Sequence, residues 1–569
     1  MRKVKKLLGL LLAAVMVLAM SVPTFAAEGD DYTITINNET SGHTYEAYQV
    51  FQGDLYGNVL SNIEWGTGVD DADLQEALKD EGAFADCESA AEVAEVLDDY
   101  GYDSDEMKAF ADIAAKYLTT ANGTSVYVAA SDGRPAHYTI SNLPEGYYLI
   151  KDADASLAGK DDAYTDYILQ VVKDVSVDPK SDVPTVEKKV QENSDKYDQN
   201  EGYGDGYNDV ADWNIGDEVP FKLFGTLPDE DSWVDYTTYT YIFHDTMSTG
   251  LSLVEDSIHV YIADKDSKGE EPAEGKEIPK DDYDILVSGT KNAPEDACSF
   301  EVRFEDLKPV HSVDGTAVSA DSIIIVKYNA ILNEDAEIGL PGNTNNVYLE
   351  FSNNPNGMGT GETPKDYVIV FTYELDVTKV AGEDTDHTLS GAEFKLYREI
   401  DNPSGDDPIL EYVIVDSNGK VTGWTTNKDA DGTTLTSGSD GKFIVSGLDD
   451  GTYYLEETKA PDGYNKLPNP IEIVIDATTS NGQGWQGSEN GSTAGNALTA
   501  LTIKVDNGEA VGSGDAYLGI VDTEVKNNAG STLPETGGMG TTIFYVLGAI
   551  LVLGAGGLLI ARRRTDSEK

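Results

Sequence analysis

Two lysines of this chain lie where the strand pattern would bury them. Residues 375–379 read Leu-Asp-Val-Thr-Lys, and residues 186–190 read Val-Glu-Lys-Lys-Val. Because successive side chains of a strand point to opposite faces, Lys379 and Lys188 share the faces of their apolar neighbours. Burial in an apolar core shifts a lysine toward its neutral, nucleophilic form. Both side chains are therefore candidate nucleophiles.

The same parity places two asparagines on inward faces. Asn527 shares the face of Val525, shortly before the C-terminal segment. Asn353 continues the apolar face of the alternating segment 347–351, so it is preferred over the neighbouring Asn354.

A carboxyl group in a third segment could also be buried. Asp217 lies in phase with Val219 and Phe221, and a carboxylate buried there needs a polar partner. Asp245, within the segment 243–246, is an alternative acid.

The two ends of the sequence carry export signals. An apolar run at 543–561 and arginines at 562–564 follow a pentapeptide made of Leu533, Pro534, Glu535, Thr536 and Gly537. As a helix the run would span roughly 28 Å, about the hydrocarbon thickness of a bilayer, with the arginines on the cytoplasmic side. Residues 1–26 match a secretory signal peptide. We therefore expect an exported chain that is held in a membrane only as a precursor.

Composition excludes several classes of protein. The formal net charge of −64 excludes nucleic acid as a partner. Only two cysteines, Cys87 and Cys298, exist, which excludes a disulfide framework. The histidines form no catalytic pattern, so we expect no enzyme site, no cofactor and no metal. The acid-rich segment 198–212 is interpreted as a solvated loop, and the segment 427–438, which lacks a closing glutamate, as a turn.

The pattern of elements predicts a mainly β fold. Short alternating segments rich in Val, Ile, Tyr and Thr, separated by Gly, Asn and Asp, predict tandem immunoglobulin-like β-sandwiches. Residues 73–118 show helical spacing instead, so we expect two or three helices inserted in the first domain. Proline- and glycine-rich linkers predict domains at 27–180, 181–372 and 373–530, before the C-terminal signal at 533–569.

Three motifs resemble a known family. The pentapeptide, apolar run and basic tail are similar to the sorting signals of sortase substrates. Residues 453–464, Tyr-Tyr-Leu-Glu-Glu-Thr-Lys-Ala-Pro-Asp-Gly-Tyr, look like the E-box of Cna-type B domains. Residues 175–180 resemble the motif of a sortase acceptor lysine, although Asp178 stands for the usual tyrosine and Val171 for the usual tryptophan. The chain thus resembles the backbone subunit of sortase-assembled pili.

The resemblance implies covalent crosslinks inside the domains. In that family a buried acid catalyses an amide bond between a lysine and an asparagine side chain, with loss of ammonia. It implies two such bonds here: Lys379 to Asn527 with Glu457 as the acid, and Lys188 to Asn353 with Asp217, or alternatively Asp245, as the acid.

The first domain departs from this pattern. Lys151 occupies the place of the E-box glutamate, and residues 28–78 contain no lysine. We therefore expect no crosslink there.

The resemblance also implies how subunits would be joined. A sortase would cut after Thr536 and link it to Lys180 of the next subunit. The implied partners are identical subunits, pilus and housekeeping sortases, peptidoglycan and minor pilins, and the implied location is a pilus anchored in the cell wall. A wall-anchored monomeric adhesin or pilus tip protein is the alternative, and a secreted enzyme is a third class that has no site to support it.

Overall fold

The computed structural model describes residues 32–530 and 540–565, with short gaps inside the first range. The gaps are 57–58, 102–103, 132, 195–201, 268, 383, 404, 406, 481–482, 484, 486, 489–492, 507 and 513–515. The predicted signal peptide at 1–26 and the pentapeptide at 533–537 lie outside the described residues.

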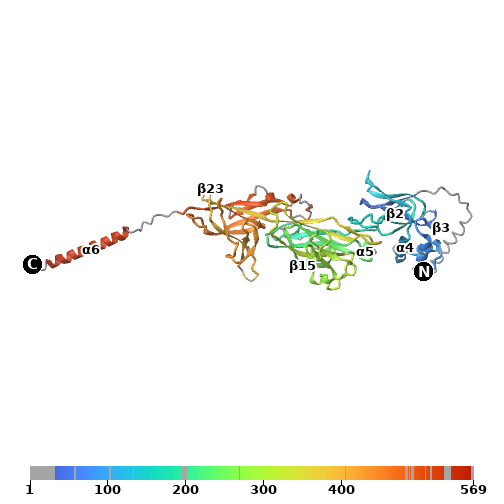
Figure 1. Cartoon of the computed structure of the whole chain (residues 1–569), viewed down its shortest axis with the longest axis horizontal. Helices are drawn as coiled ribbons and strands as arrows, with labels where there is room; N and C mark the ends of the chain where they lie inside the picture. Colours follow the sequence, from blue (N-terminus) through green and yellow to red (C-terminus); the bar gives the residue numbers. More distant parts are fainter. Residues whose placement is uncertain are drawn as a thin grey trace.

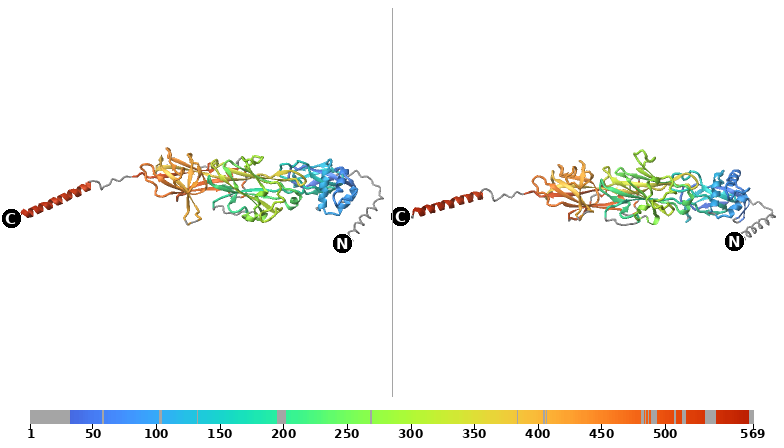
Figure 2. Two further views of the ribbon diagram at one scale, coloured as in Figure 1. Left: turned by 60° about the horizontal axis from the view of Figure 1, so that its bottom comes forward. Right: turned by 90° about the horizontal axis from the view of Figure 1, so that it is seen from below.

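The chain is mainly β, as expected, and its sheets form three blocks in a row (Figure 1). Two further views keep the blocks in sequence order along the long axis, from blue through green to orange (Figure 2). We call them the first unit (32–177), the second unit (186–371) and the third unit (373–527). Each unit contains two sheets.

The first unit has sheets in the orders β5-β6-β1-β9 and β3-β2-β7-β8, with β4 paired to β2. Its strands are β1 (Tyr32–Ile36), β2 (Tyr45–Tyr56), β3 (Val59–Trp65), β4 (Gly123–Thr124), β5 (Val126–Val128), β6 (His137–Leu143), β7 (Gly146–Asp152), β8 (Ile168–Val172) and β9 (Val175–Val177).

Helices are inserted in the first unit, as the sequence predicts. They are α2 (Asp71–Leu78), α3 (Ala90–Asp98) and α4 (Asp105–Lys116). Each begins at a side-chain cap, because Asp70, Ser89 and Ser104 accept hydrogen bonds from backbone amides of the first turn. Their apolar faces form a core of their own around Phe110 and Phe51.

The second unit has sheets in the orders β11-β10-β13-β18-β15 and β12-β21-β19-β14-β17-β16, with β20 paired to β19. Its strands and one helix are β10 (Val186–Gln191), β11 (Tyr207–Asn208), β12 (Val210–Asp212), β13 (Glu218–Thr226), α5 (Glu230–Asp235), β14 (Tyr241–Met247), β15 (Leu251–Asp264), β16 (Asp284–Val287), β17 (Phe300–Phe304), β18 (Ser322–Leu332), β19 (Asn343–Ser352), β20 (Thr360–Glu362) and β21 (Asp366–Phe371).

The third unit has a small sheet, β23-β22-β28 with β33 paired to β22, and a larger one, β26-β25-β24-β29-β30-β31-β32 with β27 paired to β24. Its strands are β22 (Tyr373–Ala381), β23 (Asp384–Thr388), β24 (Glu393–Ile400), β25 (Ile409–Val415), β26 (Val421–Thr425), β27 (Leu435–Thr436), β28 (Lys442–Leu448), β29 (Gly451–Lys459), β30 (Ile471–Thr479), β31 (Leu498–Val505), β32 (Val511–Gly512) and β33 (Ile520–Asn527).

The structure describes most of the two acidic segments that the sequence assigned to a turn and to a solvated loop. Residues 427–432 form turns between β26 and β27, as expected. The expectation of a solvated loop at 198–212 is wrong for Asp209 and Asp212, which are both 2% exposed. Asp209 forms an ion pair with Lys189, and Asp212 accepts a hydrogen bond from Tyr373 Oη at 2.7 Å, so both carboxylates have partners that sequence spacing did not reveal.

The C-terminal apolar run forms α6 (Gly540–Thr565), drawn in red away from the sheets (Figure 1). Counting only residues that the structure describes, no helix is both long enough and apolar enough to cross a membrane.

Candidate functional site

Lys379, Asn527 and Glu457 meet in the core of the third unit. Lys379 lies near the end of β22 and Asn527 at the end of β33, which pairs with β22 in parallel register. Glu457 comes from β29, in the facing sheet. The exposed fractions of these residues are 0%, 1% and 1%, so alternation along the strands does bury the lysine and the asparagine.

The three side chains form one hydrogen-bonded cluster. Lys379 Nζ donates to Asn527 Oδ1 and, at 3.1 Å, to the carbonyl of Val525. Asn527 Nδ2 donates to both carboxyl oxygens of Glu457, at 2.9 and 3.1 Å. Lys379 Nζ lies 3.7 Å from Glu457 Oε1. The amine, the amide and the carboxyl group that the sequence selected are therefore brought together.

The surroundings of Lys379 favour its neutral form. Burial lowers the pKa of Lys379 to about 8, and the charge of Glu457 only partly offsets this effect. The Phe394 ring lies 5.9 Å from Nζ, and the lysine is 0% exposed. An amine of this kind can attack the neighbouring amide carbon, while the carboxyl group can donate and accept the protons.

A second cluster of the same composition lies in the second unit. Lys188 on β10 is 0% exposed and points between the two sheets, as its parity predicts. Its Nζ donates to Asp245 Oδ2, to Asn345 Oδ1 at 2.7 Å and to Tyr328 Oη at 2.8 Å. Asp245 on β14 and Asn345 on β19 are also 0% exposed.

Tyr328 links the acid to the amide in this cluster. Its hydroxyl donates to Asp245 Oδ2 at 2.9 Å and accepts from Asn345 Nδ2 at 2.8 Å. Burial lowers the pKa of Lys188 to about 8 and raises the pKa of Asp245. Asp245 Oδ1 has no hydrogen-bond partner among the described residues. Both shifts favour a neutral amine beside a protonated acid.

The expected asparagine partner of Lys188 is elsewhere. Asn353 is buried on the face that parity assigns, but its Nδ2 donates to the carbonyls of Leu157 and Asp162, at 3.0 and 3.1 Å. It therefore joins the second unit to the first. Asn345 lies on the inward face of β19, and Asn353 directly follows the end of that strand, about 26 Å away at the usual rise per residue. Parity fixed the face, whereas the position along the strand depends on where β10 crosses it.

The expected acid Asp217 is also far from Lys188. Its carboxylate pairs with Arg398 of the third unit, with Oδ2 2.9 Å from Nη1 and Oδ1 3.1 Å from Nη2. Arg398 also binds Glu411 and stacks over the Trp424 ring at 4.3 Å. Asp217 thus has an ionic role at the junction of the second and third units, and the alternative acid, Asp245, contacts the lysine.

Lys180 lies in the segment between β9 and β10 and is half-buried, less exposed than its linker position predicts. Its backbone amide donates to Thr165 Oγ1 at 2.8 Å, and its carbonyl accepts from the Asp166 amide at 3.0 Å. Asp178, which replaces the tyrosine of the resembled motif, accepts from Asn37 Nδ2 at 2.9 Å. The segment is thus fixed to the first unit by hydrogen bonds.

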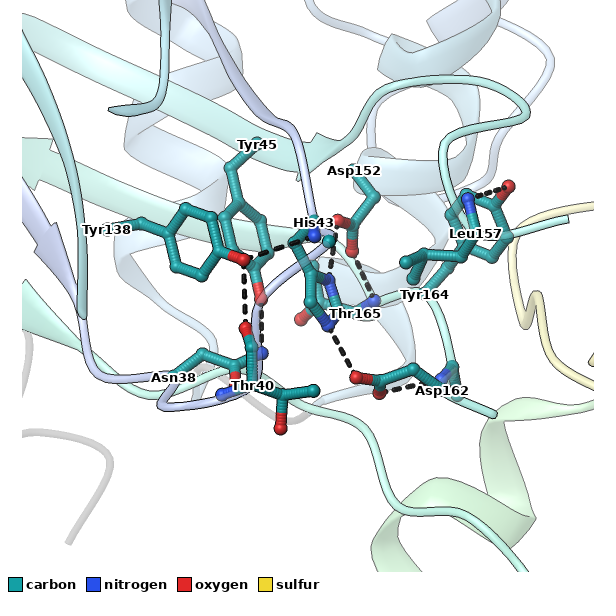
Figure 3. A network of polar contacts seen from close by, with 12 residues as sticks. Asn38, Thr40, His43, Tyr45, Tyr138, Asp152, Leu157, Asp162, Tyr164 and Thr165 are labelled. Atoms are coloured by element: carbon teal, nitrogen blue, oxygen red, sulfur yellow. Dashed lines mark hydrogen bonds and ion pairs between the residues drawn. The ribbon is translucent and has the colours of Figure 1, made fainter. Parts of the chain in front are cut away.

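The first unit contains a buried imidazole cluster that the sequence analysis missed (Figure 3). His43 Nδ1 lies 2.8 Å from Asp152 Oδ1, and Nε2 lies 2.9 Å from Asp162 Oδ2. Tyr45 stacks on the imidazole ring with 5.0 Å between centroids. Burial alone would lower the pKa of His43, but hydrogen bonds to the two aspartates outweigh it and raise the pKa to about 9. Lys151 on β7, in the E-box position, pairs with Asp154 at 2.5 Å.

Comparison with known families finds two matches. A model for a prealbumin-like fold domain matches residues 374–484, and a model for the LPXTG cell wall anchor motif matches residues 525–567. The predicted cell-wall anchor is thereby confirmed.

Individual proteins are similar over almost the whole chain. The trypsin-resistant surface T6 protein of Streptococcus pyogenes serotype M6 is 24% identical, over 98% of this chain and 99% of that protein. The solved structure of the T6 backbone pilin of serotype M6 S. pyogenes is 18% identical. The match covers 89% of this chain and 100% of that pilin, with a TM-score of 0.49. The full-length major pilin SpaD of Corynebacterium diphtheriae is 16% identical, with 88% and 98% coverage and a TM-score of 0.46. The chain is thus similar to backbone pilins.

The charged state of His43 predicts how the first unit responds to pH. The folded-state pKa of His43 is about 9, above the ordinary value of 6.5, so the protonated imidazole stabilises the folded first unit. This contribution to the free energy of unfolding is complete below pH 6.5 and is lost as pH rises through 9. The shift corresponds to about 3 kcal/mol. We expect hydrogen exchange of β2 and β7 to accelerate across that pH window beyond the intrinsic chemical rate.

The matched variants are His43→Gln and His311→Gln. His311 is an exposed histidine of the second unit. His43→Gln should remove the extra acceleration and His311→Gln should keep it, whereas equal pH dependence in both variants would contradict this assignment.

Proposed function

We propose that this chain is the repeating shaft subunit of a covalently polymerised cell-surface pilus, stabilised by isopeptide bonds that it forms itself. The observation that carries the proposal is the buried cluster of Lys379, Asn527 and Glu457, in the unit that leads into the cell-wall anchor. Burying an amine, an amide and a carboxyl group together costs free energy, because each group loses its hydration. A cluster of this kind in an apolar core therefore indicates a specific role.

The proposed reaction is a transfer of the Asn527 acyl group. Neutral Lys379 Nζ attacks Cγ of Asn527, the new C–N bond forms, and the bond from Cγ to Nδ2 breaks. Glu457, hydrogen-bonded to Nδ2, supplies a proton to the departing nitrogen and recovers the one that Nζ loses, so that ammonia leaves and the acid is regenerated. No cofactor takes part.

In the second unit we propose the equivalent bond between Lys188 and Asn345, with Asp245 as the acid. This replaces the expected pairing with Asn353 and Asp217, since contact with the nucleophile is required for reaction. Tyr328 holds both the acid and the amide and is a positioning residue.

Both bonds would shorten the path of a pulling force. Lys379 and Asn527 are 148 residues apart in sequence, and Lys188 and Asn345 are 157 apart. With each bond in place, tension crosses from the early strand of the unit to the late one, and the residues between them carry no load. By analogy with disulfide loops, each bond stabilises its unit by roughly 5 kcal/mol.

Polymerisation is proposed through Thr536 and Lys180. The anchor match supports a sortase substrate, and Lys180 lies between the first and second units, before the strand that carries Lys188. Amide bonds from Thr536 of one subunit to Lys180 of the next run head to tail, a heterologous contact that does not close and so extends as a fibre. Tension would enter at Lys180 and bypass the first unit.

Intact mass tests the internal bonds. The mature chain should weigh two ammonia units less than its sequence, because each bond releases one. Glu457→Gln should restore one unit, and Glu456→Gln, on the next position of the same strand, should not. A mass equal to the sequence mass would contradict both bonds.

The second unit offers a sharper comparison. Asp245→Ala and Asn345→Ala should each restore one ammonia unit, whereas Asp217→Ala and Asn353→Ala should leave the mass deficit unchanged. Restoration by the latter pair instead would overturn the assignment made from the geometry.

Immunoblots of cell-wall extracts test polymerisation. Wild-type chain should give a ladder of boiled, SDS-resistant species, and Lys180→Ala should abolish the ladder while wall-attached monomer and both internal bonds persist. Lys173→Ala, which changes a lysine between β8 and β9 of the first unit, is the control. If the Lys180→Ala strain still gives a ladder, another lysine is the acceptor. If the wild-type strain gives only monomer, the chain is a wall-anchored adhesin rather than a shaft subunit.

A further inference from the structure

A cluster of mixed donor atoms lies on the outer face of the second unit. It consists of His244 on β14, Glu301 on β17, and Asp296 and Cys298 in the segment that leads into β17. His244 and Glu301 are directly opposite each other in the β14–β17 register. One nitrogen, one sulfur and two carboxylate oxygens all lie within 4.8 Å of one another.

The imidazole of His244 is held with one nitrogen toward the cluster. Nε2 lies 3.1 Å from Glu350 Oε2, and the ring stacks on Tyr348 with 4.4 Å between centroids. When Nε2 carries the proton and donates to Glu350, the lone pair of Nδ1 faces Asp296 Oδ2 at 3.1 Å and Glu301 Oε1 at 3.5 Å. A carboxylate on the outer nitrogen is the arrangement that orients metal-binding histidines.

The two carboxylates are oriented in the same way. Arg303 donates to Glu301 Oε2 from Nη2 at 2.9 Å and from Nε at 3.2 Å, which leaves Oε1 toward His244. Tyr348 Oη donates to Asp296 Oδ2 at 2.8 Å, and the Cys298 amide donates to Asp296 Oδ1 at 3.1 Å. The imidazole and both carboxylates therefore have supporting contacts, whereas the Cys298 thiol donates to the Phe300 carbonyl at 3.4 Å and must give up this bond on binding a metal.

We propose that His244, Asp296, Cys298 and Glu301 bind one divalent transition-metal ion of the zinc class. A nitrogen, a sulfur and two oxygens match the donors of tetrahedral zinc, whereas calcium and magnesium sites use oxygen alone. Donor atoms of such a site are about 3.4 Å apart, so the cluster must contract by roughly 1 Å on binding. Asp296 is on an exposed segment and its side chain is 36% accessible, which lets that side move.

Metal binding here competes with protons. The thiolate rather than the thiol is the metal ligand, so the Cys298 proton must leave when the metal binds. Binding therefore breaks the S–H bond and releases a proton as the sulfur–metal bond forms, and affinity falls at low pH. The net charge of −64 concentrates divalent cations near the chain.

Cobalt titration of the tag-free mature chain tests the proposal. After removal of metals with a chelator, we expect one Co²⁺ per chain by native mass spectrometry and a thiolate-to-cobalt charge-transfer band in the near ultraviolet. Zn²⁺ should displace Co²⁺ and abolish the band. Glu350→Gln, which removes the contact on the outer nitrogen, should weaken binding about tenfold.

Matched cysteine variants separate this site from adventitious binding. Cys298→Ser should abolish the band, while Cys87→Ser, which changes the buried thiol of the first unit, should retain it. His244→Gln removes a second donor independently and should lower affinity more than tenfold. The proposal is overturned if wild-type chain binds no stoichiometric Co²⁺, or if Cys298→Ser gives the same band and affinity as wild type.

Discussion

A lysine side chain inside an apolar core must have polar partners there, because its ammonium group loses the hydration that water supplied. Lys188 and Lys379 are both 0% exposed, and each contacts an acid and an asparagine amide. This constraint sets the architecture of the second and third units. The strand that carries the lysine must pass next to the strands that carry the acid and the amide. The placement of the strands therefore decides which residues can join each cluster.

The two clusters satisfy this constraint in different ways. In the third unit, the lysine and the asparagine lie on neighbouring parallel strands of one sheet, and Glu457 reaches them from the facing sheet. In the second unit, the lysine lies in one sheet, whereas Asp245 and Asn345 lie in the other. A bond at Lys379 would therefore lock two adjacent strands, and a bond at Lys188 would lock two sheets together. The same proposed chemistry would thus resist shear between strands in the third unit and separation of the two sheets in the second.

The first unit contains a buried ionic cluster around a histidine. His43 bridges Asp152 and Asp162, and the carbonyl of Asp162 accepts a hydrogen bond from Asn353 of the second unit. The side chain that strand parity proposed as a crosslink partner thus serves as a contact between units. At the other junction, Asp217 and Arg398 form a bidentate ion pair. The polar side chains that the sequence predicted to be buried are therefore of two kinds. Some lie in the buried lysine clusters, and others, such as Asn353 and Asp217, form contacts between units.

The sequence by itself determined the mainly β fold, the helical insertion, the cell-wall anchor and the inward faces of Lys188, Lys379, Asn353 and Asn527, because alternation along a strand is a local property. It also placed Glu457 beside Lys379 and Asn527, through a motif rather than through geometry. Only the tertiary structure decided that Asn345 and Asp245 contact Lys188. Asn345 on β19 and Asn353 just after its end have the same parity, and parity carries no information about where another strand crosses β19. The clusters around His43 and His244 were equally out of reach, since their members come from distant segments that meet only when the sheets pair.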